Sequence, residues 1–335
     1  MSIQITIIGM GQMGGSMGLA LAAQKDAFLR VGNDKDIKTA NRAKQLGAID
    51  RVEFNLPRSV VDAAIVILAL PLDQIRETLQ LIASDLKEDA IVMDTAPVKA
   101  DVIQWISELL PPQCHYIGLA PVLNPAYLDT SGSGIEAARA DLFKNGLMAI
   151  VCPPGEPAEA IKLATDFSSL LGAPHLFIDP VELDSMMAST QLLPQLLAVA
   201  LINSTVDRPG WYDARKLAGH SYAQVVSAIE ESGKGETLAS QAITAREHLI
   251  RHLDVLIDIL YELKQQLDSE EKEKILQELE KAIAGREKWL NERRAGNWFQ
   301  ADNISNVELP TATQTFKRMF TFGGGRKPKQ PNQPK

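Results

Sequence analysis

A strand-like run that ends in a glycine-rich turn and leads at once into a helical pattern opens the chain. Residues 3–14 read IQITIIGMGQMG, so the turn consists of Gly9, Met10, Gly11, Gln12, Met13 and Gly14. The first glycine lets the chain turn sharply, the second lets the backbone approach a pyrophosphate, and the third lets the helix pack closely on the strand. The free N–H groups and the dipole of the helix start favour phosphate. This arrangement predicts a dinucleotide site, although a glycine turn that binds nothing would look the same when taken alone.

An acidic residue stands where such a site needs one. The next predicted strand, Phe28 to Gly32, is soon followed by Asp34, twenty residues after Gly14. A carboxylate at this place accepts hydrogen bonds from the adenosine ribose hydroxyls and repels a 2′-phosphate. We therefore predict that the cofactor is NAD. Lys35 follows directly and would soften this preference by attracting the phosphate.

Predicted strands and helices alternate as far as about Pro180. The run IVILAL at residues 65–70, closed by Pro71, is typical of a parallel strand that is buried on both faces. Further strands are predicted at 90–94, 115–119 and 147–152, and helices at 37–46, 72–86 and from Lys99 to about Leu110. The alternation predicts an α/β Rossmann-like domain with a doubly wound parallel sheet over residues 1–180.

From residue 181 onward the apolar residues recur only with helical spacing, which predicts helices at about 181–206, 212–231, 236–267 and 270–294. One apolar stripe with three- and four-residue spacing contains Leu249, Leu253, Leu256, Ile257, Leu260 and Leu263. Four helices in one chain offer few partners for such a stripe, so we predict an all-α dimerisation domain over 181–300 and a homodimer. Residues 301–335 form a C-terminal tail whose last dozen residues lack apolar content and are predicted to be disordered.

Composition excludes several classes of function. A formal charge of −8 argues against a general nucleic-acid binder. The two cysteines, Cys114 and Cys152, make no disulfide framework, and no Cys/His spacing suggests a metal site. No apolar run reaches the ~18 residues of a membrane span, and the N-terminus lacks the pattern of a signal peptide. We expect a cytoplasmic protein that binds small molecules, without a membrane or nucleic-acid partner.

Several segments, taken in order, resemble the prephenate/arogenate dehydrogenase family, over roughly residues 3–300. They are the loop from Gly9 to Ser16, the Leu70-Pro71-Leu72-Asp73 strand end, the turn from Asp94 through Thr95 to Lys99, and the helix around Pro194. The resemblance implies that Leu70, Pro71 and Thr95 lie beside the nicotinamide. It also implies an NAD-dependent oxidative decarboxylation in tyrosine biosynthesis.

The chain departs from the family where the chemistry is carried out. The family base lies in a Gly-x-His-Pro motif, and here Ala120 takes the histidine's place in Gly118-Leu119-Ala120-Pro121. Two further family histidines fall on Leu192 and Gln195, and the serine of the turn falls on Pro97. The substrate-binding arginine falls on Lys216, with Arg215 beside it.

Two residues are candidate replacements for the missing base. Lys99 follows the carboxyl end of a strand, where open sheets bind ligands; its alternative is a solvated lysine at a helix start. His220 follows the segment that binds substrate in the family, and its alternative is a purely structural role.

Candidate substrate contacts come from one loop and two helices. Asn124 lies in the loop 121–127 and could bind substrate or only pack the loop. Gln191 and Gln195 are one turn apart on an apolar helix, need partners if buried, and are predicted to face the substrate cleft. Arg215 and Lys216 could bind a carboxylate, the arginine better because its guanidinium is bidentate, or could form a surface pair.

The sequence thus predicts an NAD-dependent prephenate/arogenate dehydrogenase-like enzyme, weakened or altered in substrate. One alternative is a catalytically inactive NAD-binding regulatory protein. Another is a β-hydroxyacid-type dehydrogenase, but that family expects a lysine behind a glycine-rich segment, and residues 192–207 contain neither lysine nor glycine.

Overall fold

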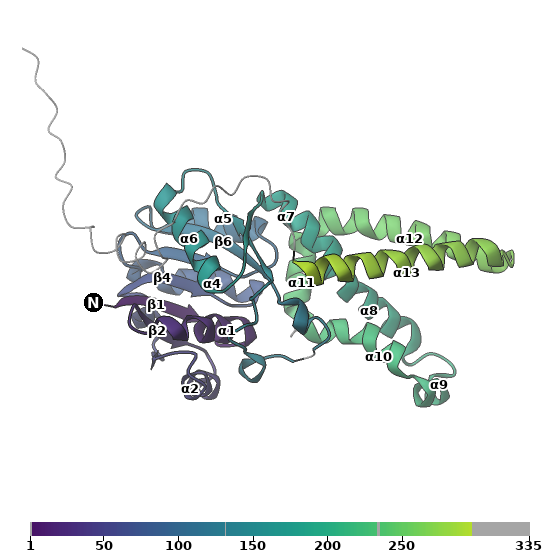
Figure 1. The fold of residues 1–335 in the computed structure, drawn as a ribbon, viewed down its shortest axis with the longest axis horizontal. Coiled ribbons are helices and arrows are strands. Elements are labelled where there is room, and N and C mark those ends of the chain that lie inside the picture. Colours follow the sequence, from purple (N-terminus) through teal and green to yellow (C-terminus); the bar gives the residue numbers. More distant parts are fainter. Residues whose placement is uncertain (1, 131, 233–234, 297–335) are drawn as a thin grey trace, which may run out of the picture.

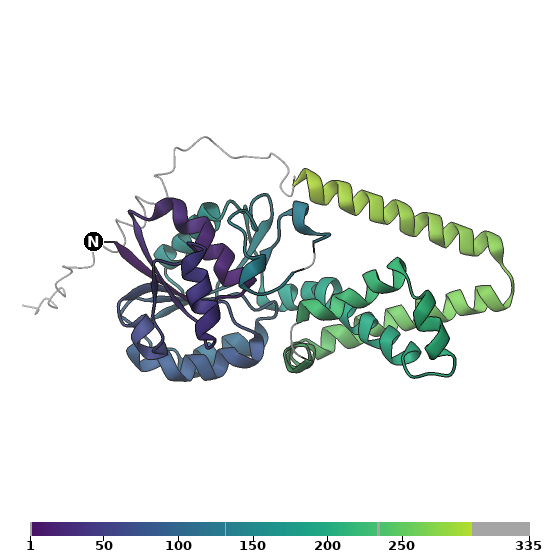
Figure 2. The same cartoon turned by 90° about the horizontal axis from the view of Figure 1, so that it is seen from below.

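A computed structural model of the protein describes residues 2–130, 132–232 and 235–296. The predicted tail 301–335 lies outside these residues. The chain forms a sheet domain, which contains the N-terminal strand, and a helical part from which a long hairpin of two helices projects (Figure 1). Seen from below, the second helix of this hairpin runs back toward the sheet domain (Figure 2).

Eight strands form one sheet in the order β3-β2-β1-β4-β5-β6-β7-β8. They are β1 (Ile3–Ile8), β2 (Phe28–Asn33), β3 (Arg51–Val52), β4 (Ala63–Leu68), β5 (Ile91–Asp94), β6 (His115–Val122), β7 (Leu147–Val151) and β8 (His175–Phe177). This confirms the doubly wound sheet, but β7 pairs antiparallel with β6, and β8 pairs parallel with β7. The described residues between β6 and β7 form short 3-10 turns and no α-helix of the kind that usually carries a parallel crossover, and the chain returns antiparallel.

Helices cover both faces of the sheet. They are α1 (Gln12–Ala20), α2 (Ile37–Gln45), α3 (Leu56–Val60), α4 (Leu72–Ile82), α5 (Ala100–Leu109) and α6 (Ala158–Leu170). Along β4, Ile65 and Ile67 join the core beneath α1 and α6, while Val66 and Leu68 join the core beneath α4 and α5. Because alternate side chains of a strand point to opposite faces, burial of both faces explains the unbroken apolar run in the sequence.

The helical part contains more elements than the four predicted periods. They are α7 (Pro180–Met187), a π-helical turn (Ala188–Leu192), α8 (Leu193–Thr205), α9 (Trp211–Leu217), α10 (His220–Val226), α11 (Gly235–Thr244), α12 (Arg246–Asp268) and α13 (Lys272–Ala295). Pro194 is the second residue of α8, just after the π-helical turn, where proline is tolerated because the N–H that it lacks has no partner within the helix. By length and hydropathy alone, Pro180–Thr205 is a candidate membrane span, but a core helix of a soluble protein passes the same test.

The apolar stripe of α12 is only partly buried within this chain. Leu249 is 3% exposed, but Ile257 and Leu260 are 59% and 53% exposed. On α13, Leu279 and Ile283 are also more than half exposed. The projecting hairpin therefore presents apolar side chains for which the described residues of one chain provide no cover.

Candidate functional site

The glycine turn after β1 is held in place by its packing. Gly9 has φ +91°, and a Cβ on it would lie 2.4 Å from the carbonyl oxygen of Ala69. A Cβ on Gly14 would lie 2.0 Å from the oxygen of Gly9, so both positions require glycine. A Cβ on Gly11 would meet nothing within 4 Å. The backbone at Gly11 therefore borders open space at the start of α1, where a diphosphate needs close approach.

Asp34 lies beside this turn. Its Oδ2 accepts a hydrogen bond from the backbone N–H of Met10 at 2.7 Å, and its Oδ1 accepts one from Asp36 N–H at 2.8 Å. The carboxylate thus joins the end of β2 to the glycine turn. The Lys35 side chain contacts α4, where its Nζ donates a hydrogen bond to Oε1 of Gln74 at 3.0 Å.

The two residues after the glycine motif dock a distant loop. A Cβ on Gly15 would lie 2.6 Å from Cδ1 of Ile135, and the Ser16 hydroxyl accepts a hydrogen bond from Arg139 N–H at 2.9 Å. Arg42 of α2 and Glu136 of the same loop form an ion pair at 2.7 Å. The loop 123–146, which follows β6, is therefore fixed to the helix that starts at the glycine turn. No local sequence pattern predicts this contact.

The carboxyl ends of the central strands lie in one row beside the glycine turn. Ile8 is paired with Leu68, Leu68 with Asp94, and Asp94 with Gly118. The predicted cofactor residues Leu70, Pro71 and Thr95 directly follow the ends of β4 and β5. The Thr95 N–H donates to the Leu68 oxygen at 3.1 Å. Strand order reverses between β1 and β4, and ligands of open α/β sheets bind at such a point.

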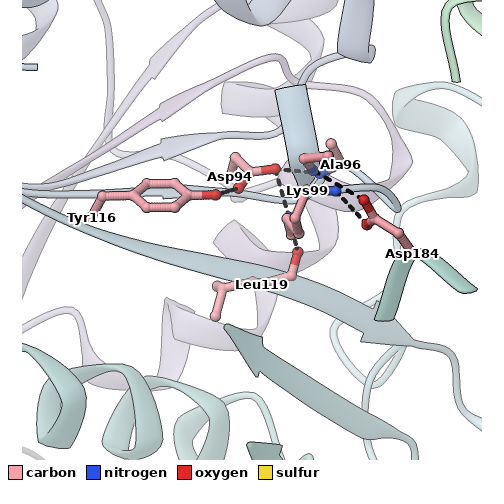
Figure 3. Close-up of polar contacts among 7 residues, drawn as sticks. Asp94, Ala96, Lys99, Tyr116, Leu119 and Asp184 are labelled. Atoms are coloured by element: carbon pink, nitrogen blue, oxygen red, sulfur yellow. Dashed lines mark hydrogen bonds and ion pairs between the residues drawn. The ribbon is translucent and has the colours of Figure 1, made fainter. Parts of the chain in front are cut away.

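Lys99 is the centre of a buried polar cluster, not a solvated lysine at a helix start. Its Nζ donates to Oδ1 of Asp94 at 2.7 Å and to the oxygen of Leu119 at 2.9 Å (Figure 3). Both side chains of the Lys99–Asp94 pair have zero exposure. The other carboxylate oxygen of Asp94 accepts the Tyr116 hydroxyl at 2.5 Å. Burial lowers the pKa of the Lys99 ammonium, and the carboxylate of Asp94 opposes that shift.

Asp184 of α7 joins the helical part to this cluster. Its two carboxylate oxygens accept hydrogen bonds from the backbone N–H groups of Lys99 and Ala100, at 2.6 and 3.0 Å (Figure 3). Asp184 is only 3% exposed, and burial raises the pKa of its carboxyl while the two N–H donors oppose the shift. The carboxylate thereby fixes the first turn of α5 against α7.

The position of the family base is apolar. Ala120 is 1% exposed and belongs to a buried cluster with Ala149, Val151 and Leu183. Leu192, at a second histidine position, is fully buried in another apolar core. Within the described residues, neither position offers a side chain that can accept a proton.

The other predicted substrate residues divide into two groups. Asn124 is used by its own loop, because Oδ1 accepts from Ala126 N–H and Nδ2 donates to the Asp141 oxygen. Gln195 is 2% exposed, and its Oε1 has no hydrogen-bond partner in the described structure. Gln191 precedes it by one turn, in the π-helical turn, and is half-buried. An unpaired buried amide oxygen is costly, so Gln195 is the stronger candidate for a ligand contact.

Arg215, Lys216 and His220 lie away from the sheet within one chain. The first two are exposed on α9, at the far end of the helical part (Figure 1). Lys216 forms an ion pair with Asp213 at 2.7 Å, and the Arg215 guanidinium lies 4.5 Å from the ring centre of Tyr212. His220 begins α10 and is exposed. The structure does not bring these three residues to the Lys99 cluster.

Sequence reasoning missed Tyr116, the contacts of Asp184, and His248 of α12. His248 lies close enough to Asp184 to act on its pKa electrostatically, and its Nδ1 accepts a hydrogen bond from Arg251 at 2.7 Å. A tyrosine inside an otherwise apolar strand was the available signal for Tyr116. No local pattern could pair Asp184 with the first turn of α5, because 84 residues separate Asp184 from Ala100.

Comparisons with known proteins agree with this geometry. Residues 17–176 match the family described as prephenate dehydrogenase, nucleotide-binding domain. Prephenate dehydrogenase of Bacillus subtilis is 26% identical over 204 residues, which is 60% of this chain and 53% of that protein. Cyclohexadienyl dehydrogenase of Zymomonas mobilis is 29% identical over 198 residues, or 59% and 66%. The chain thus spans between about half and two thirds of the length of these curated relatives.

Solved structures show the same fold over most of the chain. Prephenate dehydrogenase from A. aeolicus, in complex with hydroxyphenyl propionate and NAD+, has a TM-score of 0.74 at 20% identity and covers 86% of this chain and 98% of that one. Arogenate dehydrogenase from Synechocystis has a TM-score of 0.67 at 21% identity and covers 86% and 100%. Identities this low establish the fold only.

Proposed function

We propose that this chain is a member of the prephenate/arogenate dehydrogenase family, an NAD-dependent dehydrogenase that oxidatively decarboxylates prephenate, arogenate or a related substrate. The match of residues 17–176 to the nucleotide-binding domain of prephenate dehydrogenases supports this proposal. The observation that carries the proposal is the intact dinucleotide cradle. Positions 9 and 14 have no room for a side chain, and Gly11 borders open space. The Asp34 carboxylate accepts a hydrogen bond from the backbone of the turn. These features match a diphosphate and an adenosine ribose in their expected places.

The residues of the cradle define how the cofactor would lie. The turn from Gly9 to Gly14 would hold the diphosphate, Asp34 the adenosine ribose, and the segments after β4 and β5 the nicotinamide half. NAD, when bound, supplies the hydride acceptor. The chain must then position the substrate over the ends of β4 to β6 and remove one proton from its ring hydroxyl.

Proton removal is the step for which this chain lacks the general base of the family. Ala120 cannot accept a proton, and the Lys99 ammonium is already bonded to Asp94 and Leu119. Loss of a general base costs about 10²–10⁴ in rate. We therefore propose a slow dehydrogenase or one with an altered substrate, with Gln195 as the substrate contact that the fold favours most.

We also propose that the protein is a homodimer in the cytoplasm, joined through its helical part. Apolar side chains more than half exposed on the α12–α13 hairpin support this, and they are Ile250, Val255, Ile257, Leu260, Tyr261, Leu267, Leu279, Ile283 and Trp289. Stable homodimers often bury upwards of ~2,000 Å², with apolar interfaces. A partner's α9 could then bring Arg215 and Lys216 to the sheet edge of this chain. Sedimentation at micromolar concentration tests the proposal, and a monomer would contradict it.

A cofactor-reduction assay tests the activity. The purified protein is incubated with NAD and, separately, prephenate, arogenate and simple 2- and 3-hydroxy acids, and NADH absorbance is followed. We expect turnover well below the ~10 s⁻¹ median of enzymes with one of the first two. No NADH with any substrate, despite measurable NAD binding, would refute the enzymatic reading.

The second candidate is a non-catalytic NAD-binding regulatory protein. The apolar packing around Ala120, beside an intact cradle, favours it. This function predicts NAD affinity without turnover, so the same assay combined with calorimetric titration of NAD separates the two.

A further inference from the structure

The cofactor's direction across the sheet follows from the position of Asp34, given the function proposed above. Asp34 lies at the end of β2, on one side of the glycine turn, so the adenosine half occupies that side. The nicotinamide half must then run the other way, over the ends of β4 and β5. Ile8, Leu68 and Asp94 are paired in one row, and neighbouring strands lie about 4.8 Å apart. Asp94 therefore lies about 10 Å from the turn, beneath the path of the nicotinamide half.

The buried cluster at this edge carries an excess of negative charge. It contains the carboxylates of Asp94 and Asp184 but only one ammonium, that of Lys99 (Figure 3). Tyr116 stays neutral, because burial and the nearby Asp94 raise its pKa well above the ordinary value. The N-terminus of α5 contributes roughly half a positive charge. The sum remains negative, and exposures of 0 to 3% leave little water to screen it.

Further charged groups surround the cluster. Asp73 and Asp101 lie in the first turns of α4 and α5, and both accept hydrogen bonds from threonine hydroxyls of α11. On α12, His248 acts electrostatically on Asp184, and the exposed Arg251 donates a hydrogen bond to Nδ1 of His248. These outer groups are more solvated, so they contribute less to the local potential than the buried carboxylates.

We propose that the Asp184 carboxylate helps the cofactor site to distinguish the two redox states of the cofactor. The nicotinamide ring is positively charged in NAD+ and neutral in NADH. A buried negative charge at the start of α5, the helix that follows β5, stabilises the first relative to the second. Asp184 makes the net charge of the cluster negative, because the charges of Asp94 and Lys99 cancel each other. The site would thus favour binding of the oxidised form and release of the reduced form.

Equilibrium binding of both cofactor forms tests this role without any turnover. Dissociation constants for NAD+ (calorimetry) and NADH (fluorescence) are measured at about pH 8, where free carboxyl groups are ionised. The proteins are wild type, Asp184→Asn and the matched control Tyr116→Phe, which removes a hydrogen bond from the same cluster without changing its charge. Asp101→Asn serves as a second charge variant, since Asp101 is half-buried and does not hold the Lys99 backbone.

We expect Asp184→Asn to lower the preference for NAD+ over NADH by about fivefold, equal to about 1 kcal/mol. Asp101→Asn should shift the same ratio in the same direction by a smaller factor, and Tyr116→Phe should leave it unchanged. If both charge variants bind both forms with the wild-type ratio, the role of the cluster's charge is refuted and the proposed function stands. If Asp184→Asn does not fold, an unchanged ratio in Asp101→Asn refutes the inference. Wild-type protein that binds neither form would instead contradict the proposed function.

Discussion

Replacing Lys99 by methionine tests whether the buried cluster is organised as described. The Lys99 Nζ and the Asp94 carboxylate are 2.7 Å apart, and both side chains have zero exposure. Methionine is similar in length and fills the same space, but it leaves the carboxylate of Asp94 buried without its cation. Removing one partner of a buried ion pair costs about 3–5 kcal/mol. We therefore expect Lys99→Met to lower the free energy of unfolding by about that amount.

The measurement is urea unfolding followed by tryptophan fluorescence, with Trp105 of α5 packed against the same core as Tyr116. Lys162→Met is the matched control, because Lys162 pairs with Asp166 at 3.1 Å but its side chain is 40% exposed. The Asp166 side chain is 16% exposed, so this pair is in partial contact with solvent, and a solvent-exposed pair contributes less than about 1 kcal/mol. Adding Asp94→Asn to Lys99→Met should recover part of the loss, since it removes the unpaired charge. Equal, small effects of Lys99→Met and Lys162→Met would show that Asp94 is not buried as the structure has it.

Three further predictions concern the cofactor and pH. We expect wild type to prefer NAD over NADP by at least about tenfold, since the Asp34 carboxylate accepts hydrogen bonds from the ribose hydroxyls and repels a 2′-phosphate. Asp34→Ala should abolish this preference. Equal titration curves for both cofactors in wild type would contradict the prediction. Gly11→Ala should fold normally but weaken NAD binding. Gly14→Ala should unfold at a lower urea concentration, because its Cβ would lie 2.0 Å from the Gly9 oxygen. A wild-type urea midpoint for Gly14→Ala would contradict the close packing of Gly14 on Gly9. Burial raises the pKa of Asp184 above 3.8, so the folded state holds its proton at a higher pH than the unfolded state does. Wild type should therefore gain stability relative to Asp184→Asn as pH falls toward that value, and parallel stability curves would refute the raised pKa.

Local signals predicted the sheet and the cradle well. The glycine turn and the apolar run of β4 each depend on a few neighbouring residues, so spacing alone was enough to propose Gly9, Gly14 and Asp34 as cofactor residues. The reversed direction of β7 could not, because the connection 123–146 has no periodic pattern that shows where it leads.

The candidate catalytic and substrate residues depended on contacts between distant segments. The sequence allows Lys99 to be either a ligand contact or a solvated lysine at a helix start, and it does not reveal the burial of this side chain, because Asp94 and Leu119 accept its hydrogen bonds only in the folded sheet. The spacing of Gln195 could not reveal that its amide oxygen would be left unpaired. Ala120 was recognised as a departure from the family, but its apolar surroundings come from α7 and from β7, which are remote in sequence.

The hydrogen bonds that Asp184 accepts from the first turn of α5 limit where the chain can be cut to obtain a stable fragment. The sequence suggests cutting at residue 180 to obtain the sheet domain alone, but such a fragment would lose the carboxylate that caps Lys99 and Ala100. It would also uncover Val98 and Val102, which share a core with Ala188 and Leu192. A fragment intended for crystallisation or cofactor titration should therefore retain α7 and the π-helical turn, with its end placed beyond Leu192.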